Sequence, residues 1–276
     1  MIRTAKRMAQ TTIAVTALLM LLVQSRPANA TEESSEDLAK QTQNPVANLI
    51  SVPFQNNFNF GAGPDHDMIW IMNVQPVIPI PLNKDWNLIT RTILPIINQP
   101  GLFPGQSDSF GMGDINPSVF LSPANENGFI WGAGVTTTLP TATLNELGSG
   151  EWSMGPTAVG LFMKGPWVVG ALVNQQWSIT GWRDKDVNSF LAQPFLNYNL
   201  SDGWYLTSSP ILTGNFSASS GDHWTVPVGG GVGKLWRIGK VGLPLNTQLA
   251  PYYNAVTPDF GPDWQLRFQF QFLFPR

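Results

Sequence analysis

The sequence predicts an all-β fold, a transmembrane antiparallel up-and-down β-barrel of about 12 strands that follows a short helix or lead-in. Segments of about 10 to 14 residues with strand-like composition follow one another along the chain, and the connections between them alternate between short and long. Aromatic residues recur at the segment ends. Charged residues make up 12% of the chain, about half the usual share of a soluble domain, which also favours a barrel.

The first thirty residues are predicted to be a signal peptide, residues 1–30. They begin with Arg3, Lys6 and Arg7, continue with a short apolar run, and end in a small-residue site at Ala30. The run is too short to span a bilayer as a helix, so we expect export with cleavage after Ala30. The chain contains no Cys, which excludes a lipid-anchored signal and a disulfide framework.

The charge of the chain argues against nucleic acid as a partner. Removing the signal peptide takes away four of the 15 Lys and Arg residues and none of the 18 Asp and Glu residues, so the formal net charge falls from −3 to about −7. Nucleic-acid binding needs basic patches that neutralise phosphates, and none is visible here.

Residues 31–48 form a polar lead-in with helical character, rich in Glu and Asp and ending near Pro45. One interpretation is a solvated periplasmic lead-in, and the other is a small plug or lid at the periplasmic mouth of the barrel. The barrel itself is expected over residues 49–276.

Twelve segments are expected to form the barrel, and an even number places both ends of the barrel on one side of the membrane. The expected strands cover residues 50–60, 67–81, 86–98, 110–122, 128–140, 153–163, 167–180, 187–200, 204–216, 224–236, 243–254 and 264–274. Short connections such as 164–166 and 201–203 alternate with longer ones such as 99–109 and 141–152. This alternation is typical of outer-membrane barrels, which have tight periplasmic turns and larger outer loops.

Aromatic residues are placed as membrane-interface anchors would be. Several follow the short turns directly, and Trp167 and Trp177 share one face of a strand ten residues apart, which corresponds to a rise of roughly 25 Å. The expected anchors are Trp86, Trp167, Trp177, Trp204, Trp264 and Phe274.

The last segment, residues 264–274, has the clearest strand pattern. Every second residue from Trp264 to Phe274 is apolar, and the residues between them are polar except for Leu273. Because side chains alternate between the faces of a strand, we expect the apolar face to contact lipid and Arg267 to point into the lumen. A terminal aromatic strand is also the segment by which barrel-assembly machinery is expected to recognise such proteins, so Phe274 is a candidate insertion signal.

Prolines near the middle of many segments oppose the strand assignment, because proline cannot donate to a ladder. One interpretation is a ring of bulges that shapes the wall, and the other is a kinked wall with a lateral gap toward lipid. These residues are Pro53, Pro76, Pro95, Pro117, Pro156, Pro194, Pro210, Pro227 and Pro251.

Motifs spread over nearly all of the mature chain resemble those of a known family. They are Gln75–Ile80, Asp85–Thr92, Gly113–Ile115, Phe120–Pro123, Gly148–Gly150, Gly261–Trp264 and Phe272–Pro275. The chain resembles exported proteins grouped as the "MetA-pathway of phenol degradation" family, often called transporters and distantly similar to long-chain fatty-acid and aromatic-hydrocarbon channels. The resemblance implies an outer-membrane channel for small hydrophobic or aromatic solutes, with passive passage through or along the barrel. Unlike the fatty-acid channels, this chain is expected to lack two strands and a long N-terminal hatch domain.

The expected lumen is mostly neutral and rich in amides. The polar faces of the segments supply Asn73, Gln75, Asn174, Gln176, Gln193, Asn197, Asn246, Gln248, Gln265, Gln269 and Gln271. We expect Arg91, Asp114, Gln176, Gln193, Arg267 and Gln269 to line the route of an uncharged or weakly polar solute. The alternative for the three charged residues is that they pair inside the wall and stabilise a narrow, filled barrel.

No catalytic or metal-binding pattern stands out, so the chain is expected not to be an enzyme and to need no cofactor or metal. The two histidines, His66 and His223, fall in expected outer loops, no Gly-x-Ser-x-Gly motif is present, and nothing places a serine beside either of them. The run Asp65-His66-Asp67 is a weak metal candidate, because three consecutive side chains rarely converge. A structural or adhesive barrel with a sealed lumen, and a lipid-modifying barrel enzyme, are the alternative functions.

Overall fold

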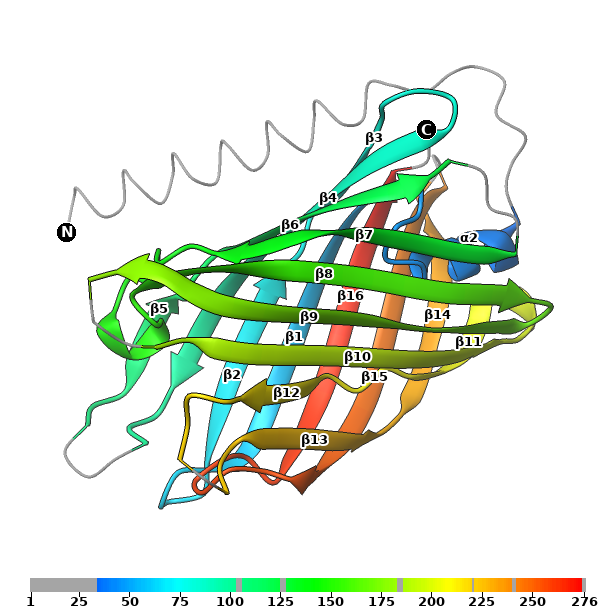
Figure 1. The fold of residues 1–276 in the computed structure, drawn as a ribbon. Helices are drawn as coiled ribbons and strands as arrows, with labels where there is room; N and C mark the ends of the chain where they lie inside the picture. Colours follow the sequence, from blue (N-terminus) through cyan, green and yellow to red (C-terminus); the bar gives the residue numbers. More distant parts are fainter. Residues whose placement is uncertain are drawn as a thin grey trace, which may run out of the picture.

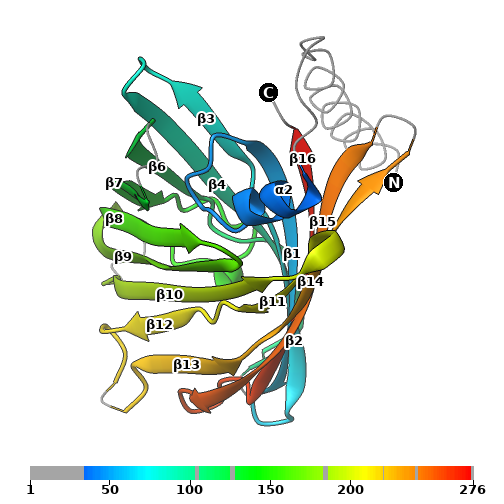
Figure 2. The same cartoon turned by 90° about the vertical axis from the view of Figure 1, so that its right-hand side faces the viewer.

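The computed structural model describes residues 34–102, 106–124, 128–182, 186–219, 221–239 and 242–274, and these form one closed antiparallel barrel with a helix inside one mouth (Figures 1 and 2). The all-β fold and the 12 expected strands are confirmed. The expected signal peptide lies outside the described residues.

Within the described residues, eight barrel strands are continuous and four are divided in two. The continuous strands are β1 (Ile50–Ala62), β4 (Trp86–Gln99), β7 (Phe129–Thr138), β8 (Glu151–Lys164), β9 (Trp167–Gly181), β10 (Asn188–Asn199), β15 (Leu243–Val256) and β16 (Trp264–Phe274). The divided strands are β2 (Asp67–Val74) with β3 (Val77–Pro81), β5 (Ser109–Met112) with β6 (Asn116–Pro123), β11 (Trp204–Ser208) with β12 (Leu212–Asn215), and β13 (Trp224–Gly229) with β14 (Gly231–Ile238).

Neighbouring strands in the chain are neighbours in the barrel, and β16 closes the ring by pairing with both β15 and β1. The short turns, such as 165–166 and the 3₁₀ turn η2 (Ser201–Gly203), lie at one end. The longer connections lie at the other end and include the loop 139–150 with the 3₁₀ turn η1 (Asn145–Leu147). We therefore refer to the inner end, with the short turns, and the outer end, with the long loops.

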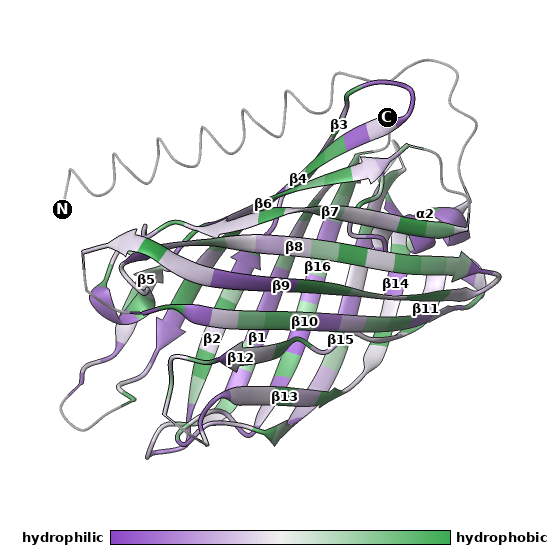
Figure 3. Ribbon diagram, viewed as in Figure 1, coloured by the Kyte–Doolittle hydropathy of each residue, from purple (hydrophilic) through white to green (hydrophobic). Residues whose placement is uncertain are grey.

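The pairing of β1 with β16 shows how the sequence pattern builds the wall. On the outer face, Phe54 stacks on Phe270 with ring centroids 4.8 Å apart, and Phe60 stacks on Trp264 at 4.1 Å. On the inner face, Asn57 lies directly opposite Arg267. Figure 3 shows the same alternation of polar and apolar residues along β1, β2, β15 and β16. The expected orientation of the last strand, with its aromatic residues outward and Arg267 inward, is thus what the structure shows.

Helix α2 (Ser35–Thr42) lies inside the inner mouth of the barrel (Figure 2). Ser34 caps it, because the Oγ atom accepts a hydrogen bond from the backbone N–H of Asp37 at 3.1 Å. Its buried face carries Leu38 and Ala39, each 1% exposed. These side chains form an apolar cluster with Ala47, Leu49, Leu235 and Leu273. The contact explains why Leu273 interrupts the polar face of β16, since it points inward against the helix.

The rest of the inner end is filled by an apolar cluster between the strands. Val46, which follows α2, packs into this cluster from the centre of the barrel. The other members come from the inner faces of six neighbouring strands, β4 and β6 to β10: Ile89, Phe120, Ile130, Val159, Leu161, Val168, Leu172 and Phe195. We call residues 34–49 the plug, from their position at the inner mouth (Figure 2) with Leu38, Ala39 and Val46 buried. That this segment acts as a plug or lid stays a prediction. The described part of the chain contains no helix with the length and apolar character needed to cross a bilayer.

Candidate functional site: a lumen of two cavities

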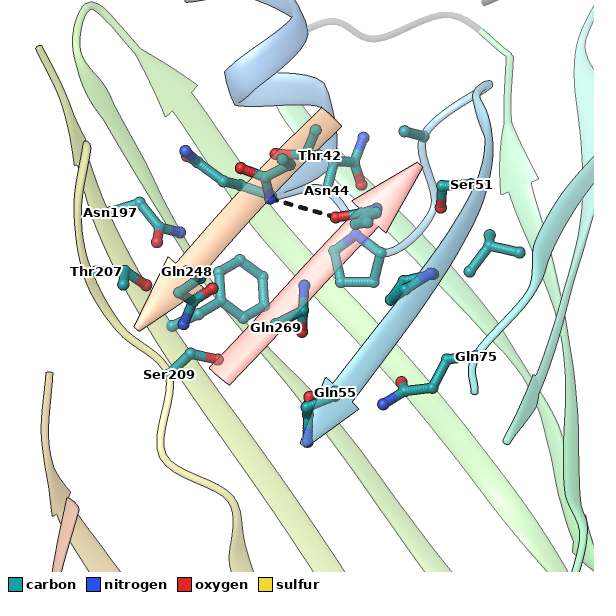
Figure 4. A pocket seen from close by; sticks show the side chains of 18 of the residues that line it. Thr42, Asn44, Ser51, Gln55, Gln75, Asn197, Thr207, Ser209, Gln248 and Gln269 are labelled. Carbon is teal, nitrogen blue, oxygen red and sulfur yellow. Dashed lines mark hydrogen bonds between the residues drawn. The ribbon is translucent and has the colours of Figure 1, made fainter. Parts of the chain in front are cut away.

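The lumen contains two cavities, one above the other along the barrel axis. The outer cavity, of about 500 Å³, is lined by residues near the long loops, such as Thr225 and Pro262. The inner cavity, of about 140 Å³, is bounded by the plug at residues 41–45. All eleven amide residues that the sequence analysis expected in the lumen line one cavity or the other. Figure 4 shows several of them, from strands on different walls, pointing toward one common space beside the plug.

Five side chains line both cavities and therefore mark the level at which the cavities meet. We call them the junction ring: Gln55, Gln75, Arg91, Gln193 and Arg267. Of the six expected lumen residues, three belong to this ring. Asp114 and Gln176 line only the outer cavity, and Gln269 lines only the inner one.

Arg267 is held by protein acceptors on three of its nitrogen atoms. Its Nε donates to Asn57 Oδ1 at 3.2 Å, its Nη1 to the carbonyl oxygen of Ser209 at 2.8 Å, and its Nη2 to Gln265 Oε1 at 3.2 Å. The guanidinium also lies over the ring of Tyr252, 4.8 Å from its centroid. With 2% of its surface exposed, this residue is part of the wall structure as well as of the lumen.

Arg91 is held much less tightly. Its Nη2 donates to Gln75 Oε1 at 2.6 Å, and this is its only hydrogen bond within the described residues. No carboxylate of the described residues forms an ion pair with Arg91 or Arg267. The alternative in which the lumenal charges pair with one another is therefore not what the structure shows.

The wall is interrupted beside the junction ring, where β11 gives way to β12. Strand β10 pairs with β11 as far as Leu196↔Ser208 and with β12 from Ala192↔Leu212, so residues 193–195 and 209–211 have no ladder pairing between them. On the other side, pairing also lapses between Thr207↔Gly231 and Thr213↔Thr225. We call residues 209–211, with the unpaired stretches that flank them, the wall break.

Side chains from the lumen replace the missing ladder bonds at Ser209. Its backbone N–H donates to the hydroxyl of Tyr252 at 3.2 Å, and its carbonyl accepts from Arg267. Its own hydroxyl accepts from Gln193 Nε2 at 2.8 Å. Because buried backbone groups need partners, Tyr252 and Arg267 make the irregular backbone at Ser209 tolerable.

The prolines act differently from one strand to the next. Pairing with one of the two neighbouring strands continues past Pro53, Pro117 and Pro251. The strand itself stops next to Pro76 and Pro210, and the pairing changes register next to Pro227. A bulge or irregularity is thus present next to Pro227, and the strand is interrupted at Pro76 and Pro210. A lateral gap toward lipid stays a hypothesis.

Asp114 holds a loop rather than standing free in the lumen. Its Oδ1 accepts from the backbone N–H of Ala142 at 3.0 Å, and its Oδ2 accepts from the N–H and the hydroxyl of Ser149 at 2.7 and 3.0 Å. These bonds tie the loop 139–150 to the gap between β5 and β6. The carboxylate is therefore occupied by loop backbone.

The expected anchors lie on the outer face and at both ends of the barrel. The rings of Trp167, Trp177, Trp204 and Trp264 are 42% to 48% exposed, and Trp86 packs edge-on against Trp131 with centroids 6.0 Å apart. Phe274 differs, since it is only 9% exposed.

Lys234 also faces outward, with its Nζ 4.6 Å and 4.4 Å from the ring centroids of Trp204 and Trp236. Its side chain therefore does not contribute to the charge of the lumen.

Sequence reasoning missed several residues of the lumen. Gln55 and Asn57 of β1 were detectable, because they alternate with Phe54 and Phe58 on the opposite face. Tyr252 and Ser209 were not, because their roles depend on the wall break and on contacts between distant strands.

The histidines show no catalytic arrangement in the part of the chain that the structure describes. The Nε2 atom of His223 lies 3.0 Å from the carbonyl oxygen of Ala218, and its ring packs against Phe216. His66 lies in the turn between β1 and β2 with a left-handed backbone. The described residues also contain no group of three or more possible metal ligands.

No protein-family model matches the chain, and no curated protein matches it. Among solved structures, it is similar to the COG4313 outer membrane channel from Pseudomonas putida F1, with a TM-score of 0.60 and 19% identity over 82% of this chain and 94% of that one. Outer membrane phospholipase A from Escherichia coli gives a TM-score of 0.42, with 13% identity over 81% and 96% of the two chains. A FadL homologue from Pseudomonas aeruginosa gives 0.39, with 9% identity over 82% and 89%.

The first of these likenesses shows a shared outer-membrane barrel fold, and the other two are too weak to carry an argument. The shared fold agrees with the expected distant relation to outer-membrane channels. Membership of the phenol-degradation family stays a prediction.

Proposed function

We propose that this protein is an outer-membrane channel that takes small solutes from the outer side into its lumen. The observation that carries the proposal is the pair of cavities that meet at the junction ring and extend from the outer loops to the plug. Most residues of the two linings carry amide or hydroxyl side chains, which can solvate a moving solute.

A solute with a hydrophobic or aromatic body fits the outer cavity. Beside its polar groups this cavity is lined by six isoleucine, leucine and phenylalanine residues, from β2, β4, β6, β9, β10 and the wall break: Ile71, Ile93, Phe120, Leu172, Leu191 and Ile211. Pockets that combine an apolar lining with a few polar groups are typical of sites for small organic molecules. This supports the class of solute that the family resemblance implies.

Passage to the periplasm requires a rearrangement, because the plug and the apolar cluster fill the inner end. We propose that the plug moves aside during passage. Its polar contacts with the wall include the paired amides of Gln43 and Asn199, whose side chains donate to each other at 2.9 and 3.2 Å. Exit through the wall break into the membrane is the second route.

Liposome uptake and planar-bilayer conductance test the proposal with the plug intact and released. Leu38→Glu introduces a carboxylate into the apolar cluster beneath α2 and should release the plug, whereas Glu36→Gln on the exposed face of the same helix is the matched control. We expect small-solute uptake by the wild type and at least a severalfold higher conductance for Leu38→Glu alone.

The sealed structural barrel is the alternative that the filled inner end favours. It requires that neither the wild type nor the plug-released variant conducts ions or admits solutes, and that result would sink the channel. Hydrolysis of phospholipid by the wild type, abolished in a His66→Ala/His223→Ala variant, would instead support the barrel-enzyme alternative.

A further inference from the structure

We propose that the solute is a small organic anion, a carboxylate with an apolar body, and that Arg91 is the residue that receives its charge. This inference rests on the proposed channel function and narrows its substrate class. It departs from the uncharged solute expected from the sequence, because both lumenal arginines lie at the same level of the lumen.

The junction ring carries positive charge that the described protein does not neutralise. Arg91 and Arg267 are its only ionisable members, and no carboxylate of the described chain pairs with either. The one acidic residue in the described lining of either cavity is Asp114, and both of its oxygen atoms already accept hydrogen bonds from the loop 139–150. A set of lining charges of one sign favours the passage of solutes of the other sign.

The two arginines contribute to this positive charge in different ways. The guanidinium of Arg267 donates from all three nitrogens to protein acceptors, so it supplies a fixed positive field. Arg91 uses one N–H of the five that a guanidinium offers, in its bond to Gln75. The planar fork of a guanidinium matches a carboxylate in two parallel hydrogen bonds, so Arg91 is free to bind the anion.

The apolar body of the solute follows from what lies above Arg91. Ile93 is two residues further along β4, on the same inner face, and Ile71 and Leu191 line the same outer cavity without lining the inner one. A solute whose carboxylate meets Arg91 therefore leaves its other end among apolar side chains. The site selects an amphiphilic anion over a simple inorganic one.

Benzoate and its uncharged isostere benzamide are suitable probes. We expect an anion-selective reversal potential for the wild type in a KCl gradient, block of the current by benzoate, and at least tenfold weaker block by benzamide. Arg91→Gln should lose the selectivity and weaken benzoate binding at least tenfold. Arg91→Lys should keep most of the selectivity but bind benzoate more weakly. Lys234→Gln removes one positive charge from the outer face and should change neither the anion selectivity nor the binding of benzoate.

Calorimetric titration of benzoate into the detergent-solubilised barrel separates this inference from the channel function. Benzoate binding that depends on Arg91 would support the anion site even if no current is measured. The absence of current would then overturn only the proposed channel function. Current without anion selectivity, equal binding of benzamide, or benzoate binding that survives in Arg91→Gln would overturn the anion site and leave the channel standing. Equal affinity for acetate and benzoate would overturn the apolar part of the proposal.

Discussion

The side chain of Arg267 illustrates how one lumenal residue serves the wall. A charged side chain at 2% exposure is costly unless its donors are satisfied, and here three nitrogen atoms have acceptors. One of those acceptors, the carbonyl of Ser209, is itself short of a partner because of the wall break. The hydrogen bond between Arg267 and the Ser209 carbonyl therefore lowers the free-energy cost of burying both groups.

Arg267→Leu should destabilise the barrel strongly. The change leaves the Ser209 carbonyl and the Oε1 atom of Gln265 without their donor, at a cost of about 3 kcal/mol for two lumenal polar groups. Urea unfolding of the protein in phospholipid vesicles measures this free energy. Gln269→Ala on the same face of β16 should shift it by less than about 0.5 kcal/mol, as most substitutions away from such networks do. Equal stability of the two variants would contradict the role assigned to Arg267.

For a single residue, the sequence predicts the face to which the side chain points better than it predicts the groups that the side chain contacts. Alternation along β16 placed Arg267 inward, because neighbouring side chains of a strand must take opposite faces. Its contact with Ser209, 58 residues away, depends on where β11 stops, which alternation does not specify. Arg91 was likewise placed in the lumen, while its shared level with Arg267 follows only from the closed barrel.

The strands themselves were predictable, with boundaries close to those observed. Turn residues bound each segment, and the mid-segment prolines correctly signalled that some ladders would be interrupted, because proline has no N–H to donate. The position of the plug was harder to predict. Its polar composition hides the few apolar residues, Leu38, Ala39 and Val46, whose burial holds it inside the barrel.

The last strand, β16, ends in the aromatic residue Phe274. Phe274 pairs with Ile50 at the inner end of the β1–β16 contact and is expected to serve as the insertion signal for barrel-assembly machinery. Phe274→Ala should lower the amount of folded protein in the outer membrane severalfold, whereas Gln269→Ala should leave it unchanged. Heat-modifiable mobility of the protein in isolated membranes reports the folded fraction. Normal levels of the Phe274 variant would show that this residue is not the signal.

For the molecule as a whole, the outer surface decides how the barrel sits in a membrane. Aromatic residues mark both ends, with Trp167 and Trp204 beside the short turns and Trp177 and Trp264 beside the long loops. Between them the outward positions are mainly aliphatic, as Val169 and Val173 of β9 show. Such a band matches the hydrocarbon layer between two interfacial girdles.

A charge placed in this apolar band should lower the free energy of unfolding. The same charge at the next residue, which faces the lumen, should have a much smaller effect. Val173→Arg points into lipid near the middle of β9 and should destabilise the barrel by about 2–4 kcal/mol. Asn174→Arg points into the outer cavity and should cost far less, because the guanidinium can reach the amide and hydroxyl side chains that line that cavity instead of lipid. Unfolding in vesicles compares the two variants directly. Similar costs would mean that the outward face of β9 is not in contact with lipid.

The stacked rings between β1 and β16 have a consequence for the order in which the barrel forms. These two strands are the first and the last of the barrel, so their contacts join the residues most distant in the chain and close the largest possible loop. We expect them to form last, because closing the largest loop costs the most conformational entropy. Loss of the Phe54–Phe270 stack should therefore leave the early rate of folding unchanged and should speed unfolding, because these contacts are absent until the barrel is complete.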